Sequence, residues 1–372
     1  MKKIFKKIHL WLSVPAGILI SVICLSGAAL VFEQDITQAL NPHLYRTEQP
    51  ANGKFLSPSE LVSGVQKQMP DLPPVASLQM PGTPEGVCMA TFEGSGKKTL
   101  SVNPYTGEIN GWTKTYPFFQ TMKKLHRWLM NPPARKGEQS AGKMIVGIST
   151  LLMVIILVSG LVIWTPRTVK ALKNRLRVSC TKGWRRFWYD SHVSLGFYST
   201  LFLLVMALTG LTWSFGWYRN AAYSLFGGNT QSAPSQPASK KGKANKEKDE
   251  KAGNREINLE TWNQVYSQLQ AIYPEYKSIT LSAKEVLVAP DPAASMRKND
   301  RISFDKENGE ITKITPYSQI PRSQTLKGWF YAFHTGSWGG TITKILYFVA
   351  ALTGGILPLS GYYLWLKRKR YI

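Results

Sequence analysis

The sequence is poor in cysteine and in acidic residues. Its 372 residues include 3 Cys, and 22 Asp and Glu stand against 46 Lys and Arg, which gives a formal net charge of +24 at pH 7. Cys24 lies in an apolar run, Cys180 in a basic segment and Cys88 alone in a polar region. We therefore expect no intrachain disulfide to join the polar regions of the chain.

Several motifs are missing as well. The sequence has no Cys-x-x-Cys-His, which excludes covalent c-type haem attachment, and no HExxH or compact His/Glu cluster, which argues against zinc or iron bound by histidines directly. It has no G-x-G-x-x-G element, so we do not expect NADPH to bind this chain. No nucleic-acid motif accompanies the positive charge.

What the sequence does have is four long apolar runs. They cover approximately residues 9–32, 143–165, 193–217 and 341–366. Each run is near or above the about 20 residues that cross roughly 30 Å of hydrocarbon. The sequence therefore predicts an integral membrane protein with four transmembrane helices and the lipid bilayer as its surroundings.

The positions of Lys and Arg predict the orientation of these helices, because cytoplasmic segments collect positive charge. Basic residues gather before the first run, between the second and third runs, and after the fourth, at residues 2–7, 167–186 and 367–370. Both termini are therefore predicted to be cytoplasmic, and residues 33–142 and 218–340 to lie outside. A cleaved signal peptide at the start is the alternative, which we reject because the similar run at 193–217 is internal.

The chain repeats itself. His9 and His192 each begin an apolar run, and a hydroxyl residue followed by Gly27 or Gly210 comes 17 residues later in both. After a polar region, a second histidine follows, His126 in LHRW and His334 in FHTG. The last runs end with equal spacing, as Gly160 before Trp164 and Gly361 before Trp365. We interpret the chain as a duplicated unit of roughly 180 to 200 residues.

The two polar regions share a plan. Each reads as one helix, at 58–69 and in INLETWNQVYSQLQAIYP, followed by short strands and a turn, YTGEI or NGEI. We expect two small α+β domains, and a disordered tether over 227–256, which is rich in Lys, Ser and Pro. We predict transmembrane helices at 1–32, 143–165, 192–217 and 341–372, the last with a basic tail. The predicted outer domains cover 33–142 and 257–340. A basic cytoplasmic loop is predicted at 166–191 and a disordered linker at 218–256.

The four repeated histidines form two pairs at two depths in this topology. His9 and His192 lie at the cytoplasmic side, and His126 and His334 lie at the outer side. Neutral imidazole is a good axial ligand of haem iron, and facing helices can supply one imidazole to each face of a porphyrin. We therefore predict two six-coordinate haem b groups per chain. The alternative is that these histidines are boundary residues or helix caps. His43 stands outside the repeat and is interpreted as an exposed loop residue.

The repeated glycines fit the same prediction. A helix turns by about 100° per residue, so Gly27 lies on the same helix face as His9, and Gly210 on the same face as His192. Both glycines are near the outer side of the membrane, whereas the two histidines are near the cytoplasmic side. Gly160 and Gly361 are level with His9 and His192. Each glycine pair would flank the haem held by the other helices; packing of helices in lipid is the alternative. Trp164 and Trp365 are most simply interfacial anchors.

The chain resembles the PepSY-associated transmembrane family, which includes inner-membrane siderophore-iron reductases of Gram-negative bacteria. The resemblance runs from about residue 5 to 370 without the tether, and it rests on HLWLSVPAGILISVICLSG, LHRW, WYDSHVSLGFYS, ALTGLTW, FHTG and the two PepSY-like modules with YTGEI and NGEI. It implies a multi-pass protein of the bacterial inner membrane with two periplasmic domains. It also implies two haems held by His9, His126, His192 and His334, without fixing which histidines pair.

The resemblance further implies electron transfer across the membrane to a ferric siderophore or another iron chelate, with release of Fe(II). A quinol or a separate cytoplasmic reductase is the expected donor. Aromatic residues near the outer haem would form a docking surface for the chelate or act only as interfacial anchors; they are Trp128, Trp329, Tyr331 and Trp338. One alternative function is a membrane-anchored PepSY module that binds or inhibits a partner without redox activity. A transporter is less consistent with the sequence, because no broken helix marks a site at mid-membrane.

Overall fold

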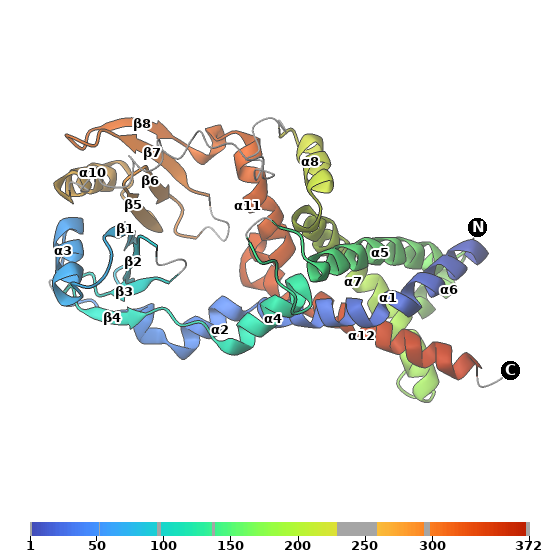
Figure 1. Ribbon diagram of the computed structural model, residues 1–372. Coiled ribbons are helices and arrows are strands. Elements are labelled where there is room, and N and C mark those ends of the chain that lie inside the picture. The colour runs from blue at the N-terminus through green and yellow to red at the C-terminus, as the bar shows by residue number, and fades with distance from the viewer. Residues whose placement is uncertain are drawn as a thin grey trace. The chain divides into compact units, whose positions relative to one another are not determined.

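The structure is a computed structural model that describes residues 2–51, 53–94, 98–135, 138–228, 259–293 and 298–369 (Figure 1). The chain divides into two compact units. One, the helical unit, comprises Met1–Gln34, Thr115–Ala233 and Arg322–Ile372, and the other, the sheet unit, comprises Asp35–Lys114 and Pro234–Pro321. Each unit is therefore assembled from segments that are far apart in the sequence.

Four helices of the helical unit are long and apolar enough to cross a membrane, as judged over the described residues. They are α1 (Lys2–Leu30), α5 (Ala141–Trp164), α7 (Trp184–Ser214) and α12 (Gly340–Lys369). α1 and α7 begin several residues before the apolar runs do, so His9 and His192 lie inside helices and not at their first residue. The helices correspond to the four predicted spans, and their starts differ because polar residues continue a helix beyond its apolar part.

The four long helices form a bundle in which α1 and α7 each pack against both α5 and α12. α1 and α7 are thus diagonal partners. Between them lies a small apolar core of α1, α5 and α7 residues, namely Ala16, Ile20, Cys24, Met153, Leu157 and Leu203. The outer faces are also apolar, since Leu201 is 66% exposed and Ile342 is 74% exposed. Such faces are stable in hydrocarbon and not in water.

Shorter helices complete the helical unit: α4 (Pro117–Trp128), α6 (Val169–Arg175), α8 (Gly216–Leu225) and α11 (Arg322–Thr335). α4 packs against α1 and α5, and α11 packs against α7. α4 starts with Pro117, which suits a first helical position, and ends where Leu129 takes the left-handed conformation with φ of 47°. Both α4 and α11 belong to the helical unit, although they lie within the predicted outer domains 33–142 and 257–340.

The predicted linker 218–256 needs a correction. Residues 218–225 are helical and belong to α8. Tyr223 of this helix packs against Leu326 and Phe330 of α11 in a small apolar cluster. That contact gives the segment apolar surface to bury, which its polar composition did not indicate. The predicted disordered tether from residue 229 onward lies outside the described residues.

The sheet unit contains one antiparallel sheet. Among the described residues its helices are α2 (Glu33–Leu40, which crosses the boundary between the units), α3 (Pro58–Gln68) and α10 (Leu259–Ile272), with 3-10 turns at Pro42–Leu44 and Tyr317–Gln319. Its strands are β1 (Val75–Pro81), β2 (Cys88–Phe92), β3 (Leu100–Val102), β4 (Ile109–Trp112), β5 (Ser278–Ser282), β6 (Val286–Ala289), β7 (Asp300–Phe304) and β8 (Ile311–Thr315).

The strand order is β4-β3-β2-β1-β5-β6-β7-β8, so each half of the sheet is a meander that runs outward from the central β1–β5 pair. In that pair Leu78 is opposite Leu281. We predicted two small α+β domains, and the strands of the two predicted regions join in this one sheet. Strands β1 and β5 would each be an open edge in a domain of its own, and pairing them removes both edges.

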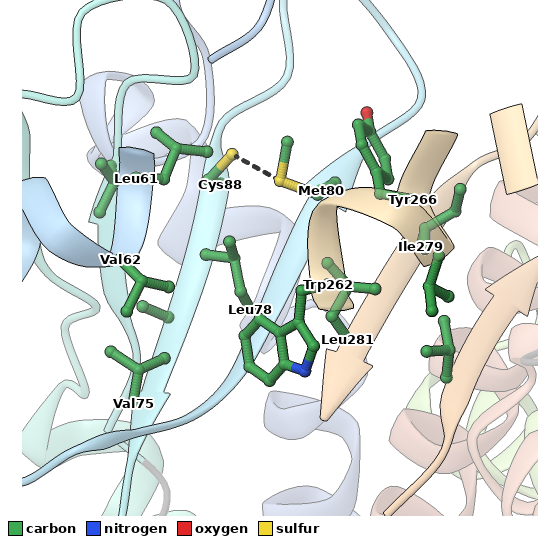
Figure 2. Packing of buried hydrophobic residues seen from close by; sticks show 14 of the residues in the cluster. Leu61, Val62, Val75, Leu78, Met80, Cys88, Trp262, Tyr266, Ile279 and Leu281 are labelled. Atoms are coloured by element: carbon green, nitrogen blue, oxygen red, sulfur yellow. Dashed lines mark hydrogen bonds between the residues drawn. The ribbon is translucent and has the colours of Figure 1, made fainter. Parts of the chain in front are cut away.

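A single core underlies the sheet, as Figure 2 shows. Trp262 of α10 and Leu61 of α3 are both 1% exposed and pack with the inward residues of β1 and β5. On each of these strands alternate residues are buried, for example Leu78 and Met80 on β1. The two halves therefore share apolar surface that neither half would cover alone. The predicted turns at Gly107 and Gly309 are present, with φ of 72° and 70°.

Candidate functional site

The first histidine pair lies between the diagonal helices of the bundle. His9 comes from α1 and His192 from α7. Their ring centroids are 6.5 Å apart and the ring planes are nearly perpendicular, at 87°. The sequence analysis predicted these two histidines at the same depth, on the cytoplasmic side of the membrane.

The second histidine pair is carried by the short helices. His126 is in the last turn of α4 and His334 in the last turn of α11. Their ring centroids are 5.9 Å apart, with the planes inclined at 46°. His43 belongs to neither pair, because it is exposed in the short turn of the sheet unit.

Each histidine ring faces one of the four repeated glycines. A β-carbon added at Gly27 would lie 2.8 Å from His126 Cε1, and one at Gly160 would lie 3.2 Å from His9 Cε1. At Gly210 the corresponding distance to His334 Cε1 is 3.1 Å, and at Gly361 the distance to His192 Cε1 is 3.5 Å. The glycines therefore allow an imidazole ring to approach the helix backbone closely.

Close approach lets the Nδ1 atom of each imidazole reach the helix that carries the glycine. His126 Nδ1 lies 2.8 Å from the Ile23 carbonyl oxygen, His334 Nδ1 2.9 Å from that of Met206, and His9 Nδ1 3.0 Å from that of Ile156. Each carbonyl belongs to the residue four positions before the facing glycine, on the same face of that helix. A carbonyl only accepts, so Nδ1 must be the protonated nitrogen in these three rings.

His192 is also protonated at Nδ1, but its hydrogen-bond acceptor is a hydroxyl group. Its Nδ1 lies 2.8 Å from Ser360 Oγ, and Ser360 Oγ donates its own proton to the Leu357 carbonyl at 2.8 Å. The hydroxyl therefore accepts from His192 Nδ1. In all four imidazoles Nε2 is then free of a proton, which is the form that binds a metal ion.

The second pair lies on helices outside the four spans, and burial favours its neutral form. Burial lowers the pKa of His334 to about 4, and the nearby His126 adds to that effect. Burial also lowers the pKa of His126, against the hydrogen bond to Ile23, which raises it. Both rings are thus neutral near pH 7, as ligation requires.

A cavity of about 560 Å³ opens beside the first histidine pair. Its lining is mostly apolar and includes His9, His192, Gly160 and Gly361. The volume is within the range of roughly 300 to 1,000 Å³ that is usual for small-molecule and cofactor sites. The structure therefore places the first pair in a cavity of cofactor size inside the bundle.

The residues present fit a haem. Imidazole nitrogens lie about 2.0 Å from a bound metal ion, so two imidazoles on opposite sides of one iron have ring centroids about 6.3 Å apart. The observed separations of 6.5 Å and 5.9 Å are close to that distance. Among the described residues no group of three or more His, Cys, Asp or Glu side chains is suited to a metal ion.

Part of this arrangement was not predicted. The hydroxyl residues before three of the glycines also contact Nδ1 of the facing imidazole: Ser159 Oγ at 3.1 Å, Thr209 Oγ1 at 3.3 Å and Ser360 Oγ at 2.8 Å. The sequence contained the signal, because Ser26, Ser159, Thr209 and Ser360 precede the four glycines. The basic residues of the cavity, Lys2, Lys6 and Arg175, were interpreted only as an orientation signal.

The predicted aromatic residues remain near the second pair. Trp329 and Trp338 each stack on Phe333, at 5.9 Å and 5.6 Å, next to His334. Tyr331 is 59% exposed. Trp128 ends α4 and lies beneath the Arg127 guanidinium at 4.4 Å. Trp329 and Trp338, which are 40% and 39% exposed, therefore form a partly exposed aromatic surface with Phe333 next to His334.

Comparison with protein families gave a match over nearly the whole chain. The model of the PepSY-associated TM region matches residues 6–368. The comparison with curated proteins gave no match.

Proposed function

Because the chain belongs to the PepSY-associated transmembrane family, we propose that it is a haem-containing reductase of the bacterial inner membrane that passes electrons across the membrane to ferric chelates. The observation that carries the proposal is the geometry of the two histidine pairs. Each pair has the ring separation of two imidazoles on one iron, and the Nδ1 bonds leave each Nε2 available.

The proposal includes the orientation and the duplication. The basic segments at residues 2–7 and 167–186 support an orientation in which both termini and the first pair are at the cytoplasmic side. The sheet unit is then periplasmic, and its two meanders are the two PepSY-like modules of a duplicated chain. The second pair lies at the periplasmic side of the bundle.

His9 with His192, and His126 with His334, would each hold one haem b, which supplies reversible one-electron oxidation and reduction of its iron. The protein's own task is to fix the imidazoles. The carbonyls of Ile23, Ile156 and Met206 hold the Nδ1 protons and so keep the rings in one tautomer. The apolar core of the bundle keeps water away from the space between the two pairs.

The arrangement suits transfer of single electrons from one side of the membrane to the other. A quinol or a separate cytoplasmic reductase would be the donor, at the side of the first pair. The acceptor would be a ferric siderophore or another chelate at the aromatic surface beside His334. Fe(II) carries less charge than Fe(III), so hard oxygen ligands bind it less tightly and the iron is released.

The decisive experiment is an absorption spectrum of the detergent-purified protein, oxidised and then reduced with dithionite, with haem counted per chain. We expect about two haems per chain. The variants His9→Ala and His192→Ala should each remove one haem and leave the same one, whereas His126→Ala and His334→Ala should leave the other. His43→Ala is the matched control and should retain both.

Oxidation of the reduced protein by a ferric chelate, followed in the same spectra, tests the direction of transfer. A colourless protein from cells supplied with haem would overturn the proposal. It would favour the alternative, a membrane-anchored PepSY module that binds a periplasmic partner, for which the eight-stranded sheet is the candidate surface.

A further inference from the structure

The cavity at the first histidine pair carries positive charge without a countercharge. Lys2, Lys6 and Arg175 line it, and no Asp or Glu is among the described residues of its lining. The nearby carboxylate of Asp190 is committed to Arg186 at 2.8 Å. Three cations along one cavity with no carboxylate among them give its lining a positive potential, which suits an anionic ligand.

Two of the cations, Lys2 and Arg175, are held by carbonyl groups at the C-terminal end of α5. Lys2 Nζ donates to the Thr165 carbonyl, and Arg175 Nη1 donates to the carbonyls of Ile163, at 3.2 Å, and Trp164. These bonds use one nitrogen of each side chain. A lysine has three donors and an arginine five, so both groups keep donors for a ligand.

Lys6 belongs to the same face of α1. It follows Lys2 by four residues and precedes His9 by three, the spacings that place side chains on one side of a helix. The ligating imidazole and two of the cations are therefore in line along α1. Lys3 and Lys7 are offset from that line and are not part of the cavity lining.

A buried indole points to a ligand acceptor in the same place. Trp164 also lines the cavity, and its Nε1 is buried without a hydrogen-bond partner in the described part of the chain. The indole ring is stacked on Phe197 with centroids 3.7 Å apart and an interplanar angle of 7°, which fixes its direction. A buried N–H that finds no acceptor costs about 1–3 kcal/mol, so a ligand oxygen would stabilise it.

We propose that Lys2, Lys6, Arg175 and Trp164 form an anion subsite for the two propionate carboxylates of the tetrapyrrole held by His9 and His192. This inference rests on the proposed function, because it needs a haem at the first pair. The site then selects a dicarboxylate porphyrin. It also fixes the direction of the porphyrin, with the carboxylates toward the end of α5 and the apolar edge in the bundle.

The test compares two variants with equal net charge in the purified, haem-loaded protein. Lys6→Gln/Arg175→Gln removes cavity cations, and Lys3→Gln/Lys7→Gln removes two neighbours outside the cavity. The readout is the rate of haem transfer to excess apomyoglobin, followed by absorbance. We expect the first variant to lose one of its two haems about tenfold faster, which corresponds to the loss of charge-assisted bonds, and the control to match the wild type.

The second haem is the internal reference, since its retention shows that the variant is folded. A complementary measurement reconstitutes haem-depleted protein with haem b or with haem dimethyl ester, which lacks the carboxylate charges. We expect the ester to fill the first site at least tenfold more weakly in the wild type. The difference should shrink in Lys6→Gln/Arg175→Gln.

Other results of these two experiments would overturn either the anion subsite or the proposed function. Equal loss rates in both variants, or equal binding of the ester and of haem b by the wild type, would overturn the subsite while leaving the two haems in place. A wild-type protein that neither contains haem nor binds added haem would overturn the proposed function, and the subsite with it.

Discussion

At the scale of the residue, the width of the gap between a glycine and an imidazole differs among the four contacts. The gap is narrowest at Gly27, where an added β-carbon would lie 2.8 Å from the His126 ring, and widest at Gly361, where it would lie 3.5 Å from the His192 ring. The first distance requires the ring to move, whereas the second is an ordinary contact. The same substitution should thus have opposite outcomes at these positions.

We predict that Gly27→Ala displaces His126 from the Ile23 carbonyl and lowers the haem content from about two to about one per chain, whereas Gly361→Ala retains about two. Haem counted against protein in the purified variants gives the measurement. Full haem content in Gly27→Ala would show that this contact does not position His126.

At the scale of the element, the start of α3 shows how a short segment is fixed by its own polar groups. Ser57 Oγ accepts from the Glu60 N–H at 3.3 Å, and the Ser57 N–H donates to Glu60 Oε2 at 2.7 Å, which is a capping box. Hydrogen bonds from the Ser57 hydroxyl, and then from its backbone N–H, lower the pKa of Glu60. The cap therefore stabilises the helix above the unfolded-state pKa of Glu60 and weakens as pH falls through the folded-state value.

We expect Ser57→Ala to speed hydrogen exchange of the first-turn amides of α3 about fivefold near pH 7, because an N-cap contributes about 1 kcal/mol. Exchange corrected for its intrinsic pH dependence should show a smaller difference at a pH low enough to protonate Glu60. Ser63→Ala, at an exposed position in the middle of α3, is the control and should leave the protection unchanged. A fivefold effect in the control would assign the change to general loosening of the helix.

At the scale of the whole molecule, the three cysteines report on orientation. Cys180 is exposed in the basic segment between α6 and α7, while Cys24 and Cys88 are buried. Burial raises the pKa of the Cys88 thiol, so this group is unreactive toward thiol reagents in the folded protein. Accessible thiol chemistry is therefore confined to Cys180 among these three.

We predict that a membrane-impermeant maleimide labels the protein in inside-out vesicles and leaves it unlabelled in spheroplasts, because the segment with Cys180 is cytoplasmic in the proposed orientation. Cys180→Ser should abolish the labelling, and denaturation should expose Cys24 and Cys88. Labelling of Cys180 in spheroplasts would reverse the proposed orientation.

Features that depend on composition and on the period of apolar residues could be predicted from the amino-acid sequence alone. The apolar runs predict four helices long enough to cross a membrane, because a span of the hydrocarbon layer needs about 20 consecutive residues that are mostly apolar. Self-similarity singled out four histidines and four glycines, and periodicity located most strands and the helices α3 and α10. The family membership was also evident from the motifs along the chain.

Which side chains and strands come into contact could be seen only in the folded chain. Whether two modules form two sheets or one depends on the edges of β1 and β5, and edge pairing leaves no mark in a strand's own pattern. The docking of an imidazole on a carbonyl four residues before a glycine joins segments more than 100 positions apart, such as Ile23 and His126. Contacts of that kind depend on how distant segments pack together, and the local sequence preference for helix or strand does not reveal them.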